Sequence, residues 1–403
     1  MKMVCSACLI SSLVILVATL ATADDSSLEK TDIFEAGTDG YAIYRIPGIV
    51  VTTKGTILAY CEARKSGSGD WGTIDVIMRR SLDGGKSWEP RQKLVEIDGP
   101  VQQNEVALKQ NLAKEGEVTV NNPVAIVDRD TGAVHFLYCV EYARCYYMRS
   151  DDEGNTFTNP TDITPTFEKF RKHYDWRVLA TGPGHGIQLT NGRLLIPVWL
   201  STGTGGHAHR PSCVSVIYSD DHGQSWQRGE IVVAHPNPVN PSETVPVQLA
   251  DGRVMLNIRH ESEPHLRGVS FSKDGATGWS KMIYDDQLTE PICMGSIIRL
   301  STGPLYKENR ILFANPHNDV DRTRKNVTIK MSYDEGKTWS VSKSLEPGTS
   351  GYSDLSVDDD RNIYCFYERG AVGESNYRPK SLCIAKFNVE WLTDNKDEFE
   401  RPK

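Results

Sequence analysis

This chain of 403 residues has few cysteines, no excess of positive charge and only one long hydrophobic run. Of its nine cysteines, Cys5 and Cys8 lie at the amino terminus, and the other seven include no Cys-x-x-Cys pair, which excludes a disulfide scaffold, although one cross-strand bond between Cys139 and Cys145 stays open. The same lack, with no His-x-x-x-His motif, argues against a structural zinc site. A net charge of −8 argues against nucleic acid as a partner. We therefore predict no metal, no cofactor and no nucleic-acid binding.

The one long hydrophobic run lies at the amino terminus. Lys2 precedes about a dozen mostly apolar residues, and the small residues Ala21 to Ala23 fit a signal-peptide cleavage site. The run is short for a membrane span, so we expect a secretory signal peptide over residues 1–23, with a retained anchor as the alternative. Residues 24–403 then form a single domain that we expect to be secreted or periplasmic, monomeric and not inserted in a membrane.

Five copies of one pattern, Ser-x-Asp-x-Gly-x-[Thr/Ser]-[Trp/Phe], recur at intervals of 53 to 69 residues. The Asp and Ser side chains of such a pattern can hydrogen-bond backbone groups of their own turn, and Gly supplies a positive φ. The fourth copy is a variant with its glycines at Gly275 and Gly278. We interpret this Asp-box repeat as architecture. The copies begin at Ser81, Ser150, Ser219, Ser272 and Ser332.

Short apolar and aromatic stretches surround each repeat, and Asn-Gly or Asp-Gly turn signals open several of them. No segment has a sustained helical period, and Phe167 to Trp176 is the best helix candidate. The 380 residues after the signal peptide, at roughly 60 per repeat, give about six units. We therefore predict an all-β fold, a six-bladed β-propeller of four-stranded antiparallel blades with Asp-box turns. A β-solenoid, whose repeats are normally shorter, is the alternative.

Charged and phenolic residues also occur outside the repeats, in strand-like segments where valine or threonine would suffice. In their order along the chain, these segments resemble the exo-α-sialidases, also called neuraminidases, over about residues 33 to 390. Asp boxes alone are a weak signal, because unrelated β proteins have them, whereas the ordered set is specific. The segments are YRIP (44–47), CEARKSGSGDW (61–71), PSETV (241–245), NIRH (257–260), RTRKN (322–326), SGYSDL (350–355) and FYERG (366–370).

The resemblance implies that three arginines, Arg45, Arg259 and Arg324, bind the carboxylate of sialic acid. Arginine suits this role because it offers planar paired donors and stays charged at any working pH. Arg322 is the rival for the third position, since a shift of register within RTRKN exchanges the two. Such a cluster supplies the local positive charge that an acidic protein needs to bind an anionic sugar.

The resemblance places the general acid/base at Asp70, in a Gly-Ser loop from which it can approach the glycosidic oxygen. Its pKa must rise well above the ordinary value of about 3.9 for it to donate a proton near neutral pH. Burial beside Trp71 under a bound sugar is the expected cause of that rise. Asp75 is the structural alternative. Arg64 matches a further family arginine, and Glu62 is its expected partner.

The resemblance also implies that Tyr352 is the nucleophile and Glu243 its partner base. A phenol suits this substrate, because the anomeric carbon of sialic acid already carries a carboxylate that would repel a second one. A free phenol, with a pKa of about 10, needs an adjacent base and positive charge to react at neutral pH. Glu368 matches the glutamate that orients Arg45. His185 lies in a segment that resembles a pocket wall, with a structural role as the equal alternative.

The function that the resemblance implies is a secreted, retaining exo-α-sialidase that releases terminal sialic acid from glycoproteins, glycolipids or oligosaccharides through a tyrosyl-enzyme intermediate. A trans-sialidase with the same residues and a non-catalytic sialic-acid-binding propeller are the alternatives. The second alternative is disfavoured, because Tyr352, Glu243 and Asp70 are all present. The linkage and N-acyl preferences are not fixed by the sequence.

Overall fold

The computed structural model describes residues 26–67, 69–263 and 265–399. The predicted signal peptide, residues 1–23, lies outside these residues. Within the described part of the chain, 26 strands and three five-residue helices are present, so the prediction of an all-β fold is confirmed. The helices are α1 (Glu105–Lys109), α2 (Thr164–Glu168) and α3 (Val389–Thr393). The predicted helix at 167–176 is therefore shorter than expected and begins earlier. None of the described helices is long and apolar enough to cross a membrane.

The strands form five sheets, in which most of the longer strands pair antiparallel with the next strand along the chain. The first sheet contains β2 (Ile43–Val51), β3 (Ile57–Arg64), β4 (Ile74–Ser81) and β5 (Gln92–Lys93). The second contains β6 (Val120–Val127), β7 (Val134–Val140), β8 (Arg144–Ser150) and β9 (Thr161–Asp162), with β11 (Gly184–His185) parallel to β6.

The third sheet contains β10 (Val178–Thr181), β12 (Ile187–Gln188), β13 (Leu194–Ser201), β14 (Ser212–Ser219), β15 (Gln227–Arg228) and β16 (Val233–Ala234). The fourth contains β17 (Thr244–Gln248), β18 (Val254–Ile258), β19 (Leu266–Ser272) and β20 (Ile283–Thr289). The fifth has seven strands: β21 (Ser296–Ser301), β22 (Arg310–Pro316), β23 (Lys325–Ser332), β24 (Val341–Val357), β25 (Ile363–Arg369), β26 (Ser381–Phe387) and β1 (Leu28–Glu35).

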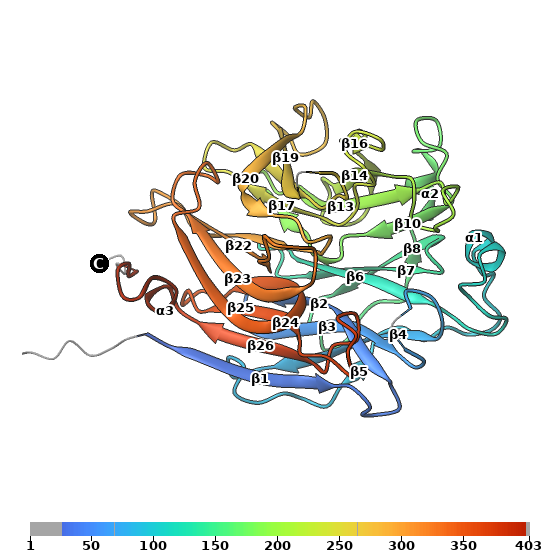
Figure 1. The fold of residues 1–403 in the computed structure, drawn as a ribbon, viewed down its shortest axis with the longest axis horizontal. Helices are drawn as coiled ribbons and strands as arrows, with labels where there is room; N and C mark the ends of the chain where they lie inside the picture. Colours follow the sequence, from blue (N-terminus) through green and yellow to red (C-terminus); the bar gives the residue numbers. More distant parts are fainter. Residues whose placement is uncertain (1–25, 68, 264, 400–403) are drawn as a thin grey trace, which may run out of the picture.

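The long strand β24 joins two parts of this fifth sheet. Its first half pairs with β23 and its second half, from Ser350, pairs with β25. The first described strand, β1, pairs with the last, β26, so the two ends of the domain are hydrogen-bonded to each other (Figure 1). A first strand that completes the last sheet ties the two ends of the described fold together.

An apolar core lies between each sheet and the next, because the facing sides of neighbouring sheets carry large hydrophobic side chains. Tyr60 of the first sheet packs edge-on against Phe136 of the second, with ring centroids 5.2 Å apart. Similar clusters join the second sheet to the third, the third to the fourth, and the fourth to β21 and β22. One more joins the two halves of the seven-stranded sheet, and another joins Phe366 of β25 to Ile49 of the first sheet.

Each Asp box begins at the last residue of the third strand of its four-stranded unit. In the first box the Ser81 hydroxyl and the Ser87 N–H both donate to Asp83 Oδ1, at 2.9 Å, and the Gly85 N–H donates to Ser81 Oγ at 2.9 Å. The φ of Gly85 is +90°, which explains the glycine at this position. The fourth box closes the same turn with one residue fewer, and this accounts for its shifted glycines.

The seven cysteines of the described residues are all buried free thiols. Cys139 on β7 and Cys145 on β8 lie directly opposite each other, and they form no disulfide here. Buried free cysteines of this kind act as small hydrophobic side chains.

Candidate active site

Three arginines that are far apart in the sequence lie around the ring of Tyr352. The guanidinium carbons of Arg45, Arg259 and Arg324 lie 5.1, 5.9 and 5.0 Å from the ring centroid. Arg45 comes from β2, Arg259 directly follows β18, and Arg324 directly precedes β23. Tyr352 itself lies in the second half of β24. The structure therefore brings these four predicted site residues together from three different sheets.

The phenol of Tyr352 is hydrogen-bonded to a carboxylate and to a guanidinium group. It donates to Glu243 Oε1 at 2.6 Å and accepts from Arg259 Nη1 at 2.7 Å, while Arg259 also forms an ion pair with Glu243. Tyr352 and Glu243 are both buried. Burial raises the pKa of the phenol above its ordinary value; of the nearest charges, Arg259 lowers it and Glu243 raises it. The hydroxyl is therefore a neutral proton donor with a carboxylate ready to take its proton.

Arg45 is fixed by Glu368, its predicted partner. Arg45 Nε donates to Glu368 Oε1 at 2.9 Å, and both side chains are buried. The second oxygen of Glu368 accepts the backbone N–H of Tyr352 at 3.2 Å, so one carboxylate positions both residues. Ile46, next to Arg45, has φ = +61°, at a bulge between β2 and β3. A β-branched residue in this region is strained, and such strain occurs preferentially at functional sites.

Asp70 lies beside two arginines at the edge of this site. Its Oδ1 is 3.1 Å from Arg64 Nη1 and 3.9 Å from Arg45 Nη1, and its side chain is 43% exposed. Arg64 in turn forms a buried ion pair with Glu62 at 2.6 Å, as predicted for these two residues. Asp75, the alternative acid, lies on β4 and accepts from Tyr41 at 2.8 Å and from Lys93 at 3.2 Å, so it is engaged elsewhere.

The charges around Asp70 lower its pKa, whereas the sequence-based expectation of a raised pKa concerned the sugar-bound site. Burial raises this pKa, but the charges of Arg64 and Arg45, with that of His209 once it is protonated in acid, outweigh burial and hold the pKa below its ordinary value. The physical reason is the number of guanidinium groups within reach, which the local sequence does not reveal. An acid role for Asp70 therefore requires that something offset these charges.

Arg324 and Arg322, the two candidates for the third arginine, make different contacts. Arg324 is buried against Tyr352, and its Nη2 donates to the Ile292 carbonyl at 2.7 Å. Arg322 instead donates to the backbone carbonyls of Glu261 and Ser262, at 3.1 and 2.7 Å. The geometry therefore groups Arg324, not Arg322, with the other two arginines.

Two aromatic residues near Asp70 were not anticipated from the sequence. His209 has its ring centroid 4.9 Å from that of Tyr142 and 6.2 Å from that of Trp71. Burial lowers the pKa of His209 to about 4, so this side chain is neutral at neutral pH. Tyr142 has φ = +48° and directly follows Glu141, with φ = +56°. Two successive non-glycine residues with positive φ are a structural signal that a single sequence does not display.

His185, for which the sequence allowed two roles, is held in a structural network. Its Nδ1 lies 2.7 Å from Asp354 Oδ1, and Asp354 also accepts from the Ser296 hydroxyl and the Ile49 N–H, both at 2.9 Å. Although burial lowers the pKa of His185, the Asp354 carboxylate raises it above its ordinary value. This buried network joins β11, β2, β21 and β24.

A different group of side chains has the composition of a cation site. Asp128, Asp130 and His222 offer ligand atoms within 4.8 Å of one another. His222 Nδ1 is hydrogen-bonded to Asp128 at 2.7 Å, and the Gln188 amide donates to both carboxylates, at 2.8 and 3.0 Å. These residues therefore satisfy one another, and His222 belongs to the third Asp box. The group is a polar network of the repeat architecture.

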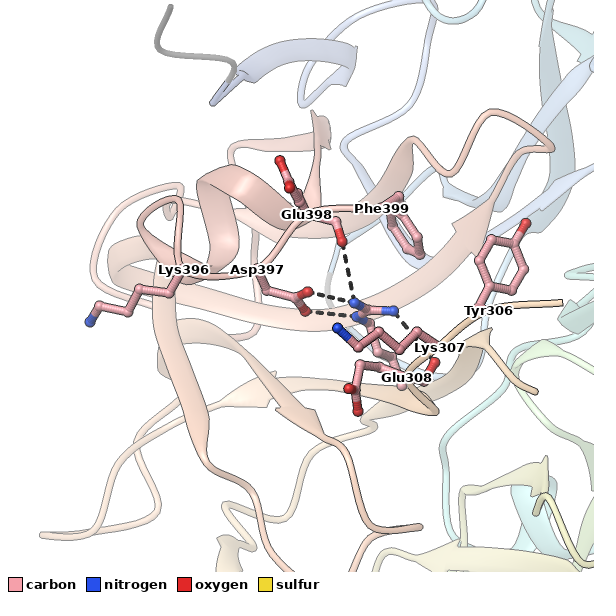
Figure 2. Close-up of a pocket in the computed structure, with 8 residues that line it drawn as sticks. Tyr306, Lys307, Glu308, Lys396, Asp397, Glu398 and Phe399 are labelled. Atoms are coloured by element: carbon pink, nitrogen blue, oxygen red, sulfur yellow. Dashed lines mark hydrogen bonds and ion pairs between the residues drawn. The ribbon is translucent and has the colours of Figure 1, made fainter. Parts of the chain in front are cut away.

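A pocket of about 270 Å³ lies away from the arginine cluster, between the C-terminal segment and the turn before β22 (Figure 2). Arg310 forms an ion pair with Asp397 across it, at 2.5 Å, and its guanidinium lies 4.8 Å from the Phe399 ring centroid. Positive and negative side chains line the pocket in equal measure: Lys307, Arg310 and Lys396 against Glu308, Asp397 and Glu398. The contacts anchor the C-terminal segment and include none of the predicted site residues.

Comparison with known proteins places this chain in a family. A model of the BNR repeat-like domain matches residues 103–365. The chain is 29% identical to a sialidase of Micromonospora viridifaciens, over 90% of this chain and 54% of that protein. It is 30% identical to a sialidase of Bacteroides fragilis, over 83% of this chain and 61% of that protein. Hadza microbial sialidase Hz136 matches with a TM-score of 0.73 and 26% identity, over 89% of this chain and 68% of that one.

The chain therefore belongs to the sialidase family with BNR repeats, as the ordered motifs predicted. It spans only 54% and 61% of the length of the two bacterial relatives.

Proposed function

We propose that this chain is an exo-α-sialidase, a retaining glycoside hydrolase that removes terminal sialic acid from glycans. One observation carries the proposal: the buried phenol of Tyr352 donates to Glu243 and accepts from Arg259, and three guanidinium groups surround its ring. A nucleophile, its base and an anion-binding cluster are thus assembled at one point. The relatives named sialidases support the same reading.

The arginine cluster binds the carboxylate of the sugar in this proposal. Arg45 and Arg259 are held by Glu368 and Glu243, so their remaining donors keep a fixed direction. Hydrogen bonds between charged groups contribute roughly 1.5 to 3 kcal/mol each, enough to select an anionic sugar over a neutral one. This local attraction acts against the net charge of −8 of the whole chain.

In the first chemical step, the Tyr352 oxygen attacks the anomeric carbon and its proton passes to Glu243. The bond to the leaving oxygen breaks as Asp70 gives that oxygen a proton. In the second step water attacks the same carbon and gives a proton to Asp70, and the tyrosyl oxygen leaves and takes its proton back from Glu243. Two displacements at one carbon retain its configuration.

Asp70 can act as the acid if substrate binding changes its surroundings. The carboxylate of the sugar offsets the charge of Arg45, and the sugar itself covers the exposed part of Asp70. Both effects raise the pKa of Asp70 toward the range in which a carboxylic acid donates protons efficiently. Asp70 would then carry its proton only while the substrate is bound.

The fold that we propose is a closed propeller of six blades within a single domain, residues 24–403. Dividing the seven-stranded sheet at the middle of β24 gives six units, each with a path of four antiparallel strands, and β1 completes the last of them. Apolar clusters between successive units, and between the last and the first, support a ring. We further propose a monomer that is secreted after cleavage of residues 1–23.

Release of sialic acid from a fluorogenic aryl sialoside tests the proposal most simply. We expect the purified chain to release the fluorophore and to act on sialyl-lactose, and we expect Tyr352→Phe to be inactive. An asialo acceptor included in the assay detects transfer, and sialyl-lactose isomers define the linkage preference. Tight sialic acid binding without turnover would instead identify a non-catalytic binding protein.

A further inference from the structure

Arg324 differs from the other arginines of the site in how its charge is compensated. Arg45 pairs with Glu368, Arg64 with Glu62 and Arg259 with Glu243. Among the residues that the structure describes, no carboxylate lies within ion-pairing distance of Arg324. Its guanidinium makes one hydrogen bond in that part of the chain, from Nη2 to the Ile292 carbonyl, and its buried Nε makes none.

Two tyrosine rings contact the Arg324 guanidinium instead. Its central carbon lies 5.0 Å from the Tyr352 ring centroid and 4.7 Å from that of Tyr377. Tyr377 comes from the turn-rich segment between β25 and β26, and it is 54% exposed while Arg324 is only 6% exposed. An exposed aromatic side chain therefore covers a buried cation at the edge of the site.

The two kinds of partner have different consequences for a ligand. A carboxylate neutralises a guanidinium and occupies its in-plane N–H groups. An aromatic face attracts the cation through its quadrupole and leaves both the charge and the in-plane donors available. Of the three arginines of the cluster, Arg324 thus has the least compensated charge and the most free donors for an anionic ligand.

We propose that Tyr377 is a positioning residue that holds Arg324 for binding the substrate carboxylate, in place of the acidic partner that each of the other arginines has. This inference rests on the proposed function, because it assigns a role within the same carboxylate-binding cluster. Tyr377 acts through the face of its ring, so an aromatic ring is required at this position and its hydroxyl is not.

Binding of a stable carboxylate ligand measures this role directly. The probe is 2-deoxy-2,3-didehydro-N-acetylneuraminic acid, titrated by calorimetry against the full chain and its variants. We expect Tyr377→Ala to raise the Kd by about 3- to 30-fold, or about 0.6 to 2 kcal/mol. KM for an aryl sialoside should rise in parallel with kcat nearly unchanged, because uniform binding is lost. Tyr377→Phe should retain the Kd of the native chain.

A second pair of variants separates positioning from direct contact. In an Arg324→Ala background, Tyr377→Ala should cause no further loss, because the side chain it holds is gone. Tyr218→Ala is the matched control, since Tyr218 contacts Arg193 in the same way, at 4.2 Å, and belongs to neither the site nor its partners. It should leave both Kd and KM unchanged.

Three outcomes would overturn the inference: an unchanged Kd in Tyr377→Ala, an equal loss in Tyr377→Phe, or an undiminished loss in the Arg324→Ala background. Failure of the native chain to bind the probe and to release sialic acid is a different result. It would refute the proposed function itself, whereas an active native chain with an indifferent Tyr377 would refute only this inference.

Discussion

The Asp boxes and the arginine cluster are built in opposite ways. Every hydrogen bond that closes a box joins residues two to five positions apart, such as Ser81 to Asp83 and Asp83 to Ser87. The site is closed by contacts such as Arg45 to Glu368 and Tyr352 to Glu243, which span 323 and 109 residues. Changes in a box should therefore affect stability, and changes in the site should affect catalysis.

The largest effect is expected from Tyr352→Phe. Loss of the hydroxyl removes the nucleophile and leaves the ring that packs against the three arginines, so kcat should fall by at least about 10³-fold. Steady-state kinetics with an aryl sialoside measures the loss, and thermal unfolding serves as the control for the fold. Activity equal to that of the native chain would contradict the expectation that changes in the site affect catalysis.

Asp70→Ala should cause a loss that depends on the leaving group. A general acid typically contributes about 10²- to 10⁴-fold, and it matters most when the leaving oxygen needs its proton. Hydrolysis of sialyl-lactose should therefore suffer far more than hydrolysis of an activated aryl sialoside. Equal losses on the two substrates would argue that Asp70 has another role.

Arg324→Ala and Arg322→Ala form a matched pair from one segment. Removing Arg324 should lower kcat/KM by about 10- to 100-fold, the effect of one or two charged hydrogen bonds. Removing Arg322, whose donors bind backbone carbonyls outside the cluster, should change kcat/KM by less than about threefold. The reverse order of the two effects would exclude the assignment made from the contacts.

The smallest effect on catalysis is expected from Asp152→Asn in the second box. Burial raises the pKa of Asp152, but hydrogen bonds from Thr156 and Ser150 lower it to about 2. Because this pKa is depressed in the folded chain, its stabilisation is present above about pH 4 and is lost as the pH falls toward 2.

We expect this variant to lower the free energy of unfolding at neutral pH by about 1 kcal/mol and to flatten its dependence on acid pH. Urea denaturation at several pH values measures both effects. The kcat per folded molecule should stay at the native value. A large loss of kcat with unchanged stability would show that the boxes have a catalytic role.

The difference between the two regions also explains what the sequence made predictable. The boxes and the short strands follow from local patterns, because Ser81, Asp83 and Gly85 interact with one another. The site residues were proposed through family resemblance. Their convergence depends on the packing of whole sheets against one another. The spacing of these residues along the sequence does not predict that packing.

Other features of the site had no sequence signal at all. Tyr377 and His209 are ordinary turn residues in the sequence, and only the contacts with Arg324 and Trp71 mark them. The lowering of the Asp70 pKa had no sequence signal either, since it is caused by arginines from two strands, Arg64 and Arg45.

Covalent trapping tests the central claim most directly. A 2,3-difluoro-sialic acid should form an adduct with the chain. Its fluorine at C2 is a good leaving group that departs as fluoride when the bond to the protein forms, and the fluorine at C3 remains and slows the breakdown of the intermediate. Digestion and mass mapping should find the added sugar on Tyr352, and Glu243→Gln should slow adduct formation. An adduct on another residue, or an initial hydrolysis product with the β configuration, would contradict the tyrosyl-enzyme mechanism.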